Sequence, residues 1–344
     1  MAPVRSLCLR VPKNMAEAAR RSLASAGVLR TDLVIKREGN HVLLPILEGG
    51  GGVGVEASPD WELIEADFEI ARRRPGDYRE LVDVPGHLRQ FLPRAFDVIG
   101  RVIVVKIPDE LTGFEKEIGR ALLAARPGCV SVALDKGVGG EERVRRLEVI
   151  AGESNLETVH IEHGARFLVD PSRVYFSPRL ATERARVAGL VAEGDSVIDL
   201  FAGVGPFSIQ IARLSKPSEV LAVDINPIAI DYLKKNIRLN RVSTVRPLLL
   251  DARRVPGLVP PADRVIMNLP HSALDFLETG LALLRPGGTI HLYIIVERER
   301  IQAALDGVRK AVERNGRVVR EISHRRVRGY SPSELHIAVD LHVG

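Results

Sequence analysis

Cysteine, lysine and long apolar runs are scarce in this chain of 344 residues. The two cysteines, Cys8 and Cys129, lie in separate apolar contexts and form no CxxC pair, so we predict reduced core residues of a cytoplasmic protein. No apolar run approaches the roughly 20 residues of a membrane helix. The first 15 residues contain no apolar segment typical of an export signal, so none is expected.

The shortage of lysine leaves arginine as the main cation. The chain has 40 Arg and 9 Lys, and its formal net charge of +5 favours a polyanionic partner. The planar guanidinium group of arginine suits phosphate groups, but a GC-rich coding bias would also produce this excess of arginine over lysine. Basic clusters lie at 72–74, 143–146 and 324–330, and each could equally be a solvated face.

Composition and length predict soluble globular domains, because 45% of residues are hydrophobic and 27% are charged. Residues 1–50 form a small N-terminal module, with a helix that begins at an Asn14 cap and ends at Gly27. Residues 51–61 belong to a glycine-rich stretch that is typical of a flexible linker.

Two larger domains are expected after the linker. Residues 62–172 mix strands with one helix and include a hairpin around Gly164, which indicates an α+β domain. In residues 173–344, short Val/Ile/Leu-rich runs alternate with helical patterns, which predicts an α/β, Rossmann-like fold with a doubly wound parallel sheet. A basic loop should join the last two strands as a closing antiparallel hairpin.

The loop "DLFAGVGPF", residues 199–207, follows the first strand of this sheet. Ligands bind at the carboxyl ends of such strands. Gly203 and Gly205 allow a tight turn, and a helix beginning near Pro206 points free N–H groups at a ligand. Ser208 replaces the third glycine of a dinucleotide fingerprint, so a dinucleotide is not favoured.

Acidic residues end three successive strands of the predicted sheet. Asp199 suits the ammonium of an amino-acid-bearing nucleoside, Asp224 can accept from both ribose hydroxyls, and Asp251 can accept from an adenine amino group. One strand-end aspartate alone is more often a helix or turn cap. The three acids in this order predict an S-adenosyl-L-methionine pocket.

The fourth strand ends in the tripeptide Asn268-Leu269-Pro270, where a carboxamide is unusual. Asn268 offers an acceptor and two donors to the edge of a planar ring, and Pro270 stiffens the turn. A plain turn with a local asparagine cap is the alternative. Because the predicted pocket lies beside it, we favour a base-holding role.

These motifs resemble a known family. The segments "DLFAGVGPFSI", "AVDINPIAIDYLKKNIRLN", "DAR" and "MNLP" are similar to the archaeal and eukaryotic tRNA (guanine-N1)-methyltransferases, which act on the guanosine 3′ of the anticodon, position 37. The likeness extends through "GVGGEERVRRLEVIAGE" and "VYFSPRLATERARV" and covers nearly the whole chain. It implies a class I methyltransferase domain, a preceding RNA-binding domain and an N-terminal module that contacts tRNA.

The resemblance also implies catalytic roles. Glu183 would be the general base, Arg143 would lie against guanine O6, Asn268 would hold the flipped base, and Tyr175 would pack near the base and the cofactor. The chemistry agrees, because removal of the weakly acidic N1 proton builds negative charge on O6, which a guanidinium stabilises. From the residues alone, Glu183 could instead pair with an arginine at helical spacing, and Arg143 could form a surface ion pair.

The remaining predicted site residues fall into two sets. The cofactor-binding set is Asp199, Phe201, Gly203, Gly205, Asp224, Asn226, Asp251, Ala252, Asn268 and Pro270. The RNA-binding set is Arg179, Arg184, Arg325 and Arg326. No spacing of His, Cys and acidic residues suggests a metal, and we expect a monomer whose partner is tRNA.

Three alternative functions remain open. The first is transfer of the aminocarboxypropyl group of the same cofactor, or methylation of a tricyclic wyosine intermediate, at the same tRNA position. The second is a non-catalytic RNA-binding protein, in which we would expect the glycine loop or the three strand-end acids to be lost. The third is a small-molecule methyltransferase, which would not need the basic arm and the linker.

Overall fold

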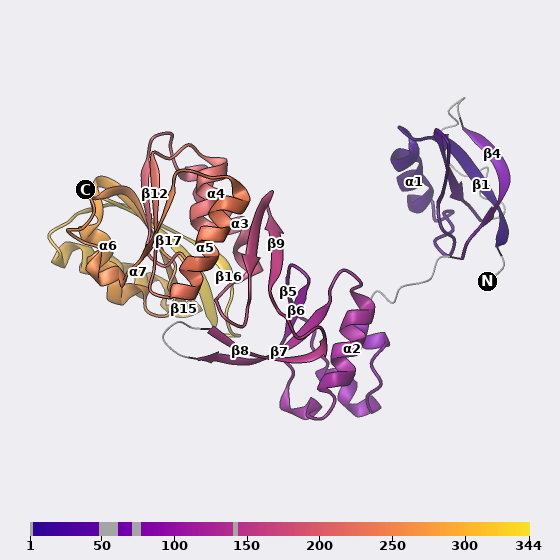
Figure 1. Cartoon of the computed structure of the whole chain (residues 1–344), viewed down its shortest axis with the longest axis horizontal. Helices are drawn as coiled ribbons and strands as arrows, with labels where there is room; N and C mark the ends of the chain where they lie inside the picture. The colour runs from indigo at the N-terminus through magenta and orange to yellow at the C-terminus, as the bar shows by residue number, and fades with distance from the viewer. Residues whose placement is uncertain (1–2, 48–60, 71–76, 140–143) are drawn as a thin grey trace. The chain divides into compact units, whose positions relative to one another are not determined.

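The computed structural model describes residues 3–47, 61–70, 77–139 and 144–344. They belong to two compact units, Met1–Gly76 and Asp77–Gly344 (Figure 1). The predicted linker 51–61 lies outside the described residues except for Trp61, and so does the basic cluster 72–74.

The first unit is an antiparallel sheet with one helix. Its strands follow the order β2-β3-β1-β4. The helix begins at Ala16 with Met15 at the N-cap position, so the predicted Asn14 cap is wrong, and it ends just ahead of Gly27, as predicted. The elements are β1 (Val4–Pro12), α1 (Ala16–Ser25), β2 (Lys36–Glu38), β3 (His41–Pro45) and β4 (Glu62–Phe68).

Strand β4 corrects the predicted domain boundary. It lies within 62–172 in the sequence, yet it pairs antiparallel with β1, from Val4 opposite Phe68 to Arg10 opposite Glu62. Phe68 is buried against Cys8 in the core of the first unit. The first unit therefore extends to residue 76, and the predicted module 1–50 lacks its edge strand.

The second unit begins with a small mixed sheet in the order β5-β6-β7-β8. Gly100, with φ of 55°, makes the tight turn between β5 and β6. Helix α2, the helix expected in this domain, buries Ile118 and Leu122, four residues apart, against this sheet. The elements are β5 (Asp97–Ile99), β6 (Val102–Val105), α2 (Glu115–Ala125), β7 (Ser131–Gly139) and β8 (Val144–Gly152).

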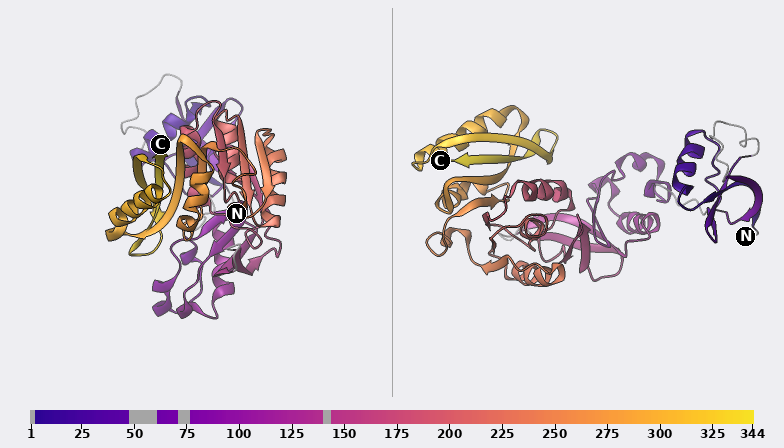
Figure 2. Two further views of the ribbon diagram at one scale, coloured as in Figure 1. Left: turned by 90° about the vertical axis from the view of Figure 1, so that its left-hand side faces the viewer. Right: turned by 90° about the horizontal axis from the view of Figure 1, so that it is seen from above.

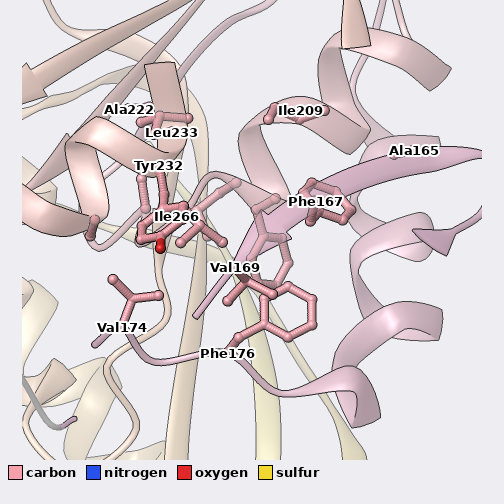
Figure 3. Packing of buried hydrophobic residues seen from close by; sticks show 14 of the residues in the cluster. Ala165, Phe167, Val169, Val174, Phe176, Ile209, Ala222, Tyr232, Leu233 and Ile266 are labelled. Atoms are coloured by element: carbon pink, nitrogen blue, oxygen red, sulfur yellow. The ribbon is translucent and has the colours of Figure 1, made fainter. Parts of the chain in front are cut away.

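The predicted hairpin around Gly164 is present as β9 (Thr158–Glu162) and β10 (Ala165–Val169). It packs on helix α5 (Pro227–Asn240), where Asn236 accepts from the Leu168 amide at 2.7 Å and donates to its carbonyl at 3.0 Å. Phe167 and Phe176 lie together in this core (Figure 3). The predicted division at residue 172 is therefore not a break between compact units.

The large sheet has seven strands in the order β13-β12-β11-β14-β15-β17-β16. The first five are parallel, and β17 joins β15 antiparallel. The predicted Rossmann-like, doubly wound sheet is confirmed. Its strands are β11 (Ser196–Asp199), β12 (Glu219–Asp224), β13 (Val245–Leu249), β14 (Ala262–Met267), β15 (Leu284–Glu297), β16 (Val319–Gly329) and β17 (Glu334–Val343).

Helices cover both faces of the large sheet (Figure 1). Ile209 of α4 and Leu233 of α5 share one core with the hairpin, while Leu281 of α6 and Val308 of α7 belong to the core on the other face. The parallel strands are consequently buried on both sides, as their continuous apolar runs predicted. The other helices of this unit are α3 (Ala181–Leu190), α4 (Pro206–Leu214), α6 (Leu277–Ala282) and α7 (Ile301–Arg314).

The C-terminal strands β16 and β17 form the predicted antiparallel hairpin (Figure 2). The basic residues expected in its connecting loop lie instead on β16, which extends to Gly329. Arg325 pairs with Ala338 and Arg326 with Ile337, so the two arginines point to opposite faces of the sheet.

The hydrogen bonds of the Asn236 carboxamide should contribute to the stability of the second unit. Replacing Asn236 with Ala removes bonds to Leu168 and to the Val204 carbonyl at 3.1 Å, and leaves buried backbone groups unpaired. We expect the free energy of unfolding to fall by about 3 kcal/mol, measured by urea denaturation. Asn315→Ala is the control, because Asn315 makes one exposed bond, to Ala311. Equal effects of the two changes would contradict this role.

Candidate active site

The predicted cofactor acids lie at one edge of the large sheet. Asp199 is the last residue of β11 and pairs with Ala222, two residues before Asp224, the last residue of β12. Asp224 pairs with Leu249, two residues before Asp251. All three strands are parallel, so the structure brings the three acids together at their carboxyl ends, as the sequence predicted.

The loop after β11 is held in a tight conformation. Gly203 and Gly205 have φ of 56° and 87°, which other residues adopt at a cost. A Cβ on Gly205 would also lie 2.3 Å from Leu233 Cδ1. The Gly203 amide donates to Asp224 Oδ2 at 2.7 Å, so the ends of β11 and β12 are joined directly.

Asp199 is the most enclosed of the three acids, with 1% of its surface exposed. The Ser208 hydroxyl donates to its Oδ2 at 2.7 Å, while its Oδ1 is buried without a hydrogen-bond partner among the described residues. Burial raises the pKa of Asp199 to about 7. An unpaired buried acceptor at a strand end fits a cationic ligand group.

The other acidic positions also organise their own loops. Asp224 Oδ1 accepts from the Asn226 amide at 2.9 Å. The Asn226 side chain caps α5 by accepting from the amides of Ile228 and Ala229. Asp251 accepts from the Arg253 amide at 2.9 Å. Each side chain therefore has a structural role, which for Asn226 uses the carboxamide oxygen.

Three further predicted residues adjoin this edge. The Phe201 ring meets the Phe276 ring edge-on at 5.0 Å, and Ala252 is buried behind the Asp251 turn. The Pro270 carbonyl accepts from the Ile295 amide at 3.2 Å, which fixes the turn after β14. Phe201 and Ala252 thereby form apolar surroundings for the acids.

Asn268 lies at the same edge of the sheet, two residues after Ile266, which pairs with Asp199. Its Oδ1 is buried without a hydrogen-bond partner among the residues that the structure describes. The last pair between β14 and β15 joins Met267 to Leu292, so Asn268 and Tyr293 are the next residues along the two strands.

Glu183, the predicted base, extends from α3 to this Tyr293. The Tyr293 hydroxyl donates to Glu183 Oε1 at 2.9 Å, and Arg186 donates to both carboxylate oxygens. The ion pair at helical spacing, which the sequence left open, is therefore present. Glu183 is 5% exposed.

Sequence reasoning missed Tyr293 and Asp340, which belong to this network. Asp340 binds Arg186 at 2.6 Å and His291 at 2.6 Å. The sequence could have indicated part of this network. His291 and Tyr293 are polar residues two positions apart in an apolar strand, so their side chains lie on the same face of the sheet.

The remaining predicted catalytic residues have different outcomes. Arg143 lies outside the described residues. Tyr175 is 40% exposed, and its carbonyl oxygen would be 3.8 Å from a Cβ on Gly203, so its backbone passes beside the glycine loop.

The predicted RNA-binding arginines divide into buried and accessible ones. Arg184 is 2% exposed, and its guanidinium binds both oxygens of Glu162 and the Ser177 carbonyl, so the prediction that it contacts phosphates is wrong. Arg179 is half-exposed and pairs with Asp97 at 2.5 Å. Arg325 and Arg326 are exposed on β16.

The described residues were not found to hold a metal cluster or a membrane-spanning helix. In the described ranges, no group of three or more His, Cys, Asp or Glu side chains is arranged to hold a metal ion. Among the same residues, no helix has the length and apolarity that a membrane crossing requires. Cys8 and Cys129 are free thiols.

The sheet order, the glycine loop and the acids at successive strand ends define a class I S-adenosylmethionine-dependent methyltransferase. Comparisons with known proteins give the family. The profile of the TRM5/TYW2 methyltransferase domain matches residues 158–320, that of the TYW2 N-terminal domain matches 79–155, and that of the tRNA methyltransferase 5 N-terminal domain matches 8–52.

Curated relatives agree with the family profiles. It is 43% identical to the tRNA (guanine(37)-N(1))-methyltransferase Trm5b of Pyrococcus abyssi, over 98% of this chain and 99% of that one. It is 34% identical to the tRNA(Phe) (4-demethylwyosine(37)-C(7)) aminocarboxypropyltransferase of Methanocaldococcus jannaschii, over 71% of this chain and 96% of that one. The chain belongs to the TRM5/TYW2 methyltransferase family, as its motifs predicted.

Similar solved structures include two complexes with ligands. The protein in the complex of aTrm5 and tRNALeu is 36% identical to this chain with a TM-score of 0.72, and the match covers 98% of this chain and 100% of that one. The Methanocaldococcus jannaschii Trm5 complex with adenosine is 35% identical with a TM-score of 0.65, and covers 98% and 99%. The predicted fold and the cofactor, S-adenosylmethionine, are thereby confirmed.

Proposed function

We propose that this protein is a tRNA (guanine-N1)-methyltransferase that uses S-adenosylmethionine to methylate N1 of the guanosine at position 37, immediately 3′ of the anticodon. The observation that supports this most directly is the convergence of Asp199, Asn268 and Glu183 at one edge of the parallel sheet. The named relative that matches the whole chain supports the same reaction.

The cofactor pocket is assigned to the strand ends. Asp199, with its unpaired Oδ1, would hold the ammonium, Asp224 the ribose hydroxyls and Asp251 the adenine amino group. Gly203 leaves the loop without a side chain where the ligand would lie, while Gly205 lets the loop pack against Leu233. When bound, S-adenosylmethionine supplies a methyl group on an electrophilic sulfonium.

The acceptor nitrogen needs a base. Guanine N1 carries a proton of low acidity and is a poor nucleophile at neutral pH, so Glu183 would take that proton. Arg143 would stabilise the negative charge that develops on O6. Asn268 would hold the edge of the flipped base with its unpaired oxygen and its amide, and Tyr175 would pack beside it.

Contacts with tRNA are assigned to exposed arginines. Arg325 and Arg326 on β16, together with the half-exposed Arg179, would meet phosphates. The N-terminal unit would add a further contact to the same tRNA. Cytoplasmic location and a monomeric state stay predictions from the sequence.

Aminocarboxypropyl transfer at the same tRNA position is the second candidate, together with methylation of a tricyclic wyosine intermediate. The aminocarboxypropyltransferase relative supports it, but matches 71% of this chain. The methyltransferase relative matches 98%, including the N-terminal unit, and therefore favours N1 methylation.

The base assignment predicts the behaviour of Glu183→Gln. This variant should bind the cofactor as the parent does, because the carboxylate is not one of the strand-end acids. Its single-turnover rate of tRNA methylation should fall roughly a hundredfold or more, because the carboxamide cannot accept the N1 proton. Glu193→Gln, an exposed change at a residue paired with Lys216, is the control. An unchanged rate in Glu183→Gln would remove it as the base.

The N-terminal unit predicts a binding defect. A variant lacking residues 1–76 removes the whole unit, whereas removing 1–50 would leave β4 without its partner strand. We expect KM for tRNA to rise about tenfold, equivalent to roughly 1.4 kcal/mol of binding, with kcat retained at saturating tRNA. Equal activity at limiting tRNA would show that the unit is dispensable.

Burial of Asp199 predicts a pH-dependent affinity for the cofactor. Its pKa of about 7 means that a proton must leave before the carboxylate binds an ammonium. The calorimetric Kd should weaken by up to about tenfold per pH unit below neutral pH, and should weaken again above about pH 8, where the ligand's own ammonium loses its proton. Adenosine, which lacks the ammonium, should bind independently of pH, and below neutral pH so should the cofactor to Asp199→Asn. A Kd of the parent protein that is flat from pH 6 to 8 would contradict the assignment.

A further inference from the structure

The Glu183 carboxylate is held by an arginine and a tyrosine. Arg186 donates to it through Nε at 2.9 Å and Nη2 at 2.6 Å, and Tyr293 donates at 2.9 Å. Arg325 Nε lies 3.9 Å from Oε2. These charge-assisted bonds fix the orientation of the carboxylate.

Arg186 is shared between two carboxylates from different elements. Its Nη1 donates to Asp340 Oδ2 at 2.6 Å and its Nη2 to Asp340 Oδ1 at 3.1 Å, in addition to the bonds with Glu183. Hydrogen bonds to both acids raise the pKa of Arg186 although burial opposes its charge. His291 Nδ1 lies 2.6 Å from Asp340 Oδ1.

Because Arg186 is shared, a movement of Glu183 would not leave the guanidinium without a charged partner. A buried guanidinium that loses its only carboxylate is costly, because its charge is then uncompensated. Arg186 would not face this cost, since Asp340 can hold it through two bonds. Glu183 can therefore turn toward a substrate while Arg186 stays in place.

We propose that Asp340 is a positioning residue that retains Arg186 while Glu183 leaves it to accept the N1 proton of guanine. This inference depends on the proposed function. In the step concerned, the N1–H bond breaks, its electron pair stays on N1, and the proton forms an O–H bond with Glu183. The groups that face Glu183 are Arg186 of α3, Tyr293 of β15, Arg325 of β16 and, through Arg186, Asp340 of β17.

The test compares two substitutions that act on the shared arginine in opposite ways. In Asp340→Asn, Arg186 has only Glu183 as a charged partner, so Glu183 becomes a weaker base that is harder to release. In Arg186→Gln, Glu183 loses its cation and becomes a stronger base. Single-turnover methylation by the full-length enzyme, with excess enzyme over unmodified tRNA, is measured from pH 5 to 9 for each variant.

We expect Asp340→Asn to lower the plateau rate about tenfold and to move the midpoint of the acidic limb about one pH unit down. Arg186→Gln should move that midpoint about one pH unit up. Asp340→Glu should restore most of the rate, because it keeps a carboxylate for Arg186. Arg285→Gln, which breaks a pair with Asp263 at the opposite ends of the strands, should leave the profile unchanged.

Midpoints that move in the same direction, or rates that fall with no movement, would overturn the proposal and leave the network a structural role. If Arg186→Gln does not fold, as judged by thermal unfolding, Arg186→Lys takes its place. Lysine keeps the charge but cannot bind both carboxylates through a fork, so an unchanged profile of Arg186→Lys would likewise contradict the proposal. A parent enzyme that makes no N1-methylguanosine would instead refute the proposed function.

Discussion

Parallel strands end at the same edge of a sheet, and this constraint determines where the predicted cofactor acids and Asn268 lie. The register between β11, β12 and β14 brings Asp199, Asp224 and Asn268 to one edge although they are far apart in the sequence. The backbone there has left the sheet, so the groups of the loops need other partners. Gly203 bonds to Asp224, and Val204 to Asn236, which ties the loop to both the sheet and the β9–β10 hairpin.

A second constraint is the cost of buried charge. Glu183 of α3 is buried, and its charge is compensated by Arg186, which is also bonded to Asp340 of β17. The same arrangement fixes the orientation of the proposed base. Burial also affects Asp199 at the cofactor pocket, where the raised pKa makes the acid responsive near neutral pH.

Sequence patterns predicted the parts of this structure that depend on local periodicity. The strands of the large sheet, the glycine loop and the positions of the three acids follow from alternating apolar and helical segments and from strand ends. Long-range pairing could not be predicted in the same way. Strand β4 joins β1 across the linker, Arg184 is enclosed by Glu162 and two aromatic rings, and Asp340 reaches Arg186 from a strand more than 150 residues away. Each of these depends on which elements become neighbours after folding.

In the proposed reaction, a methyl group passes to N1 of one guanosine of tRNA. The most direct measurement uses unmodified tRNA and two preparations of S-adenosylmethionine, one labelled in the methyl group and one in the aminocarboxypropyl group, followed by nucleoside analysis and mapping of the labelled position. We expect label from the first preparation alone, in N1-methylguanosine at position 37. Label from the second preparation, or methyl label in any other nucleoside, would contradict the proposed reaction.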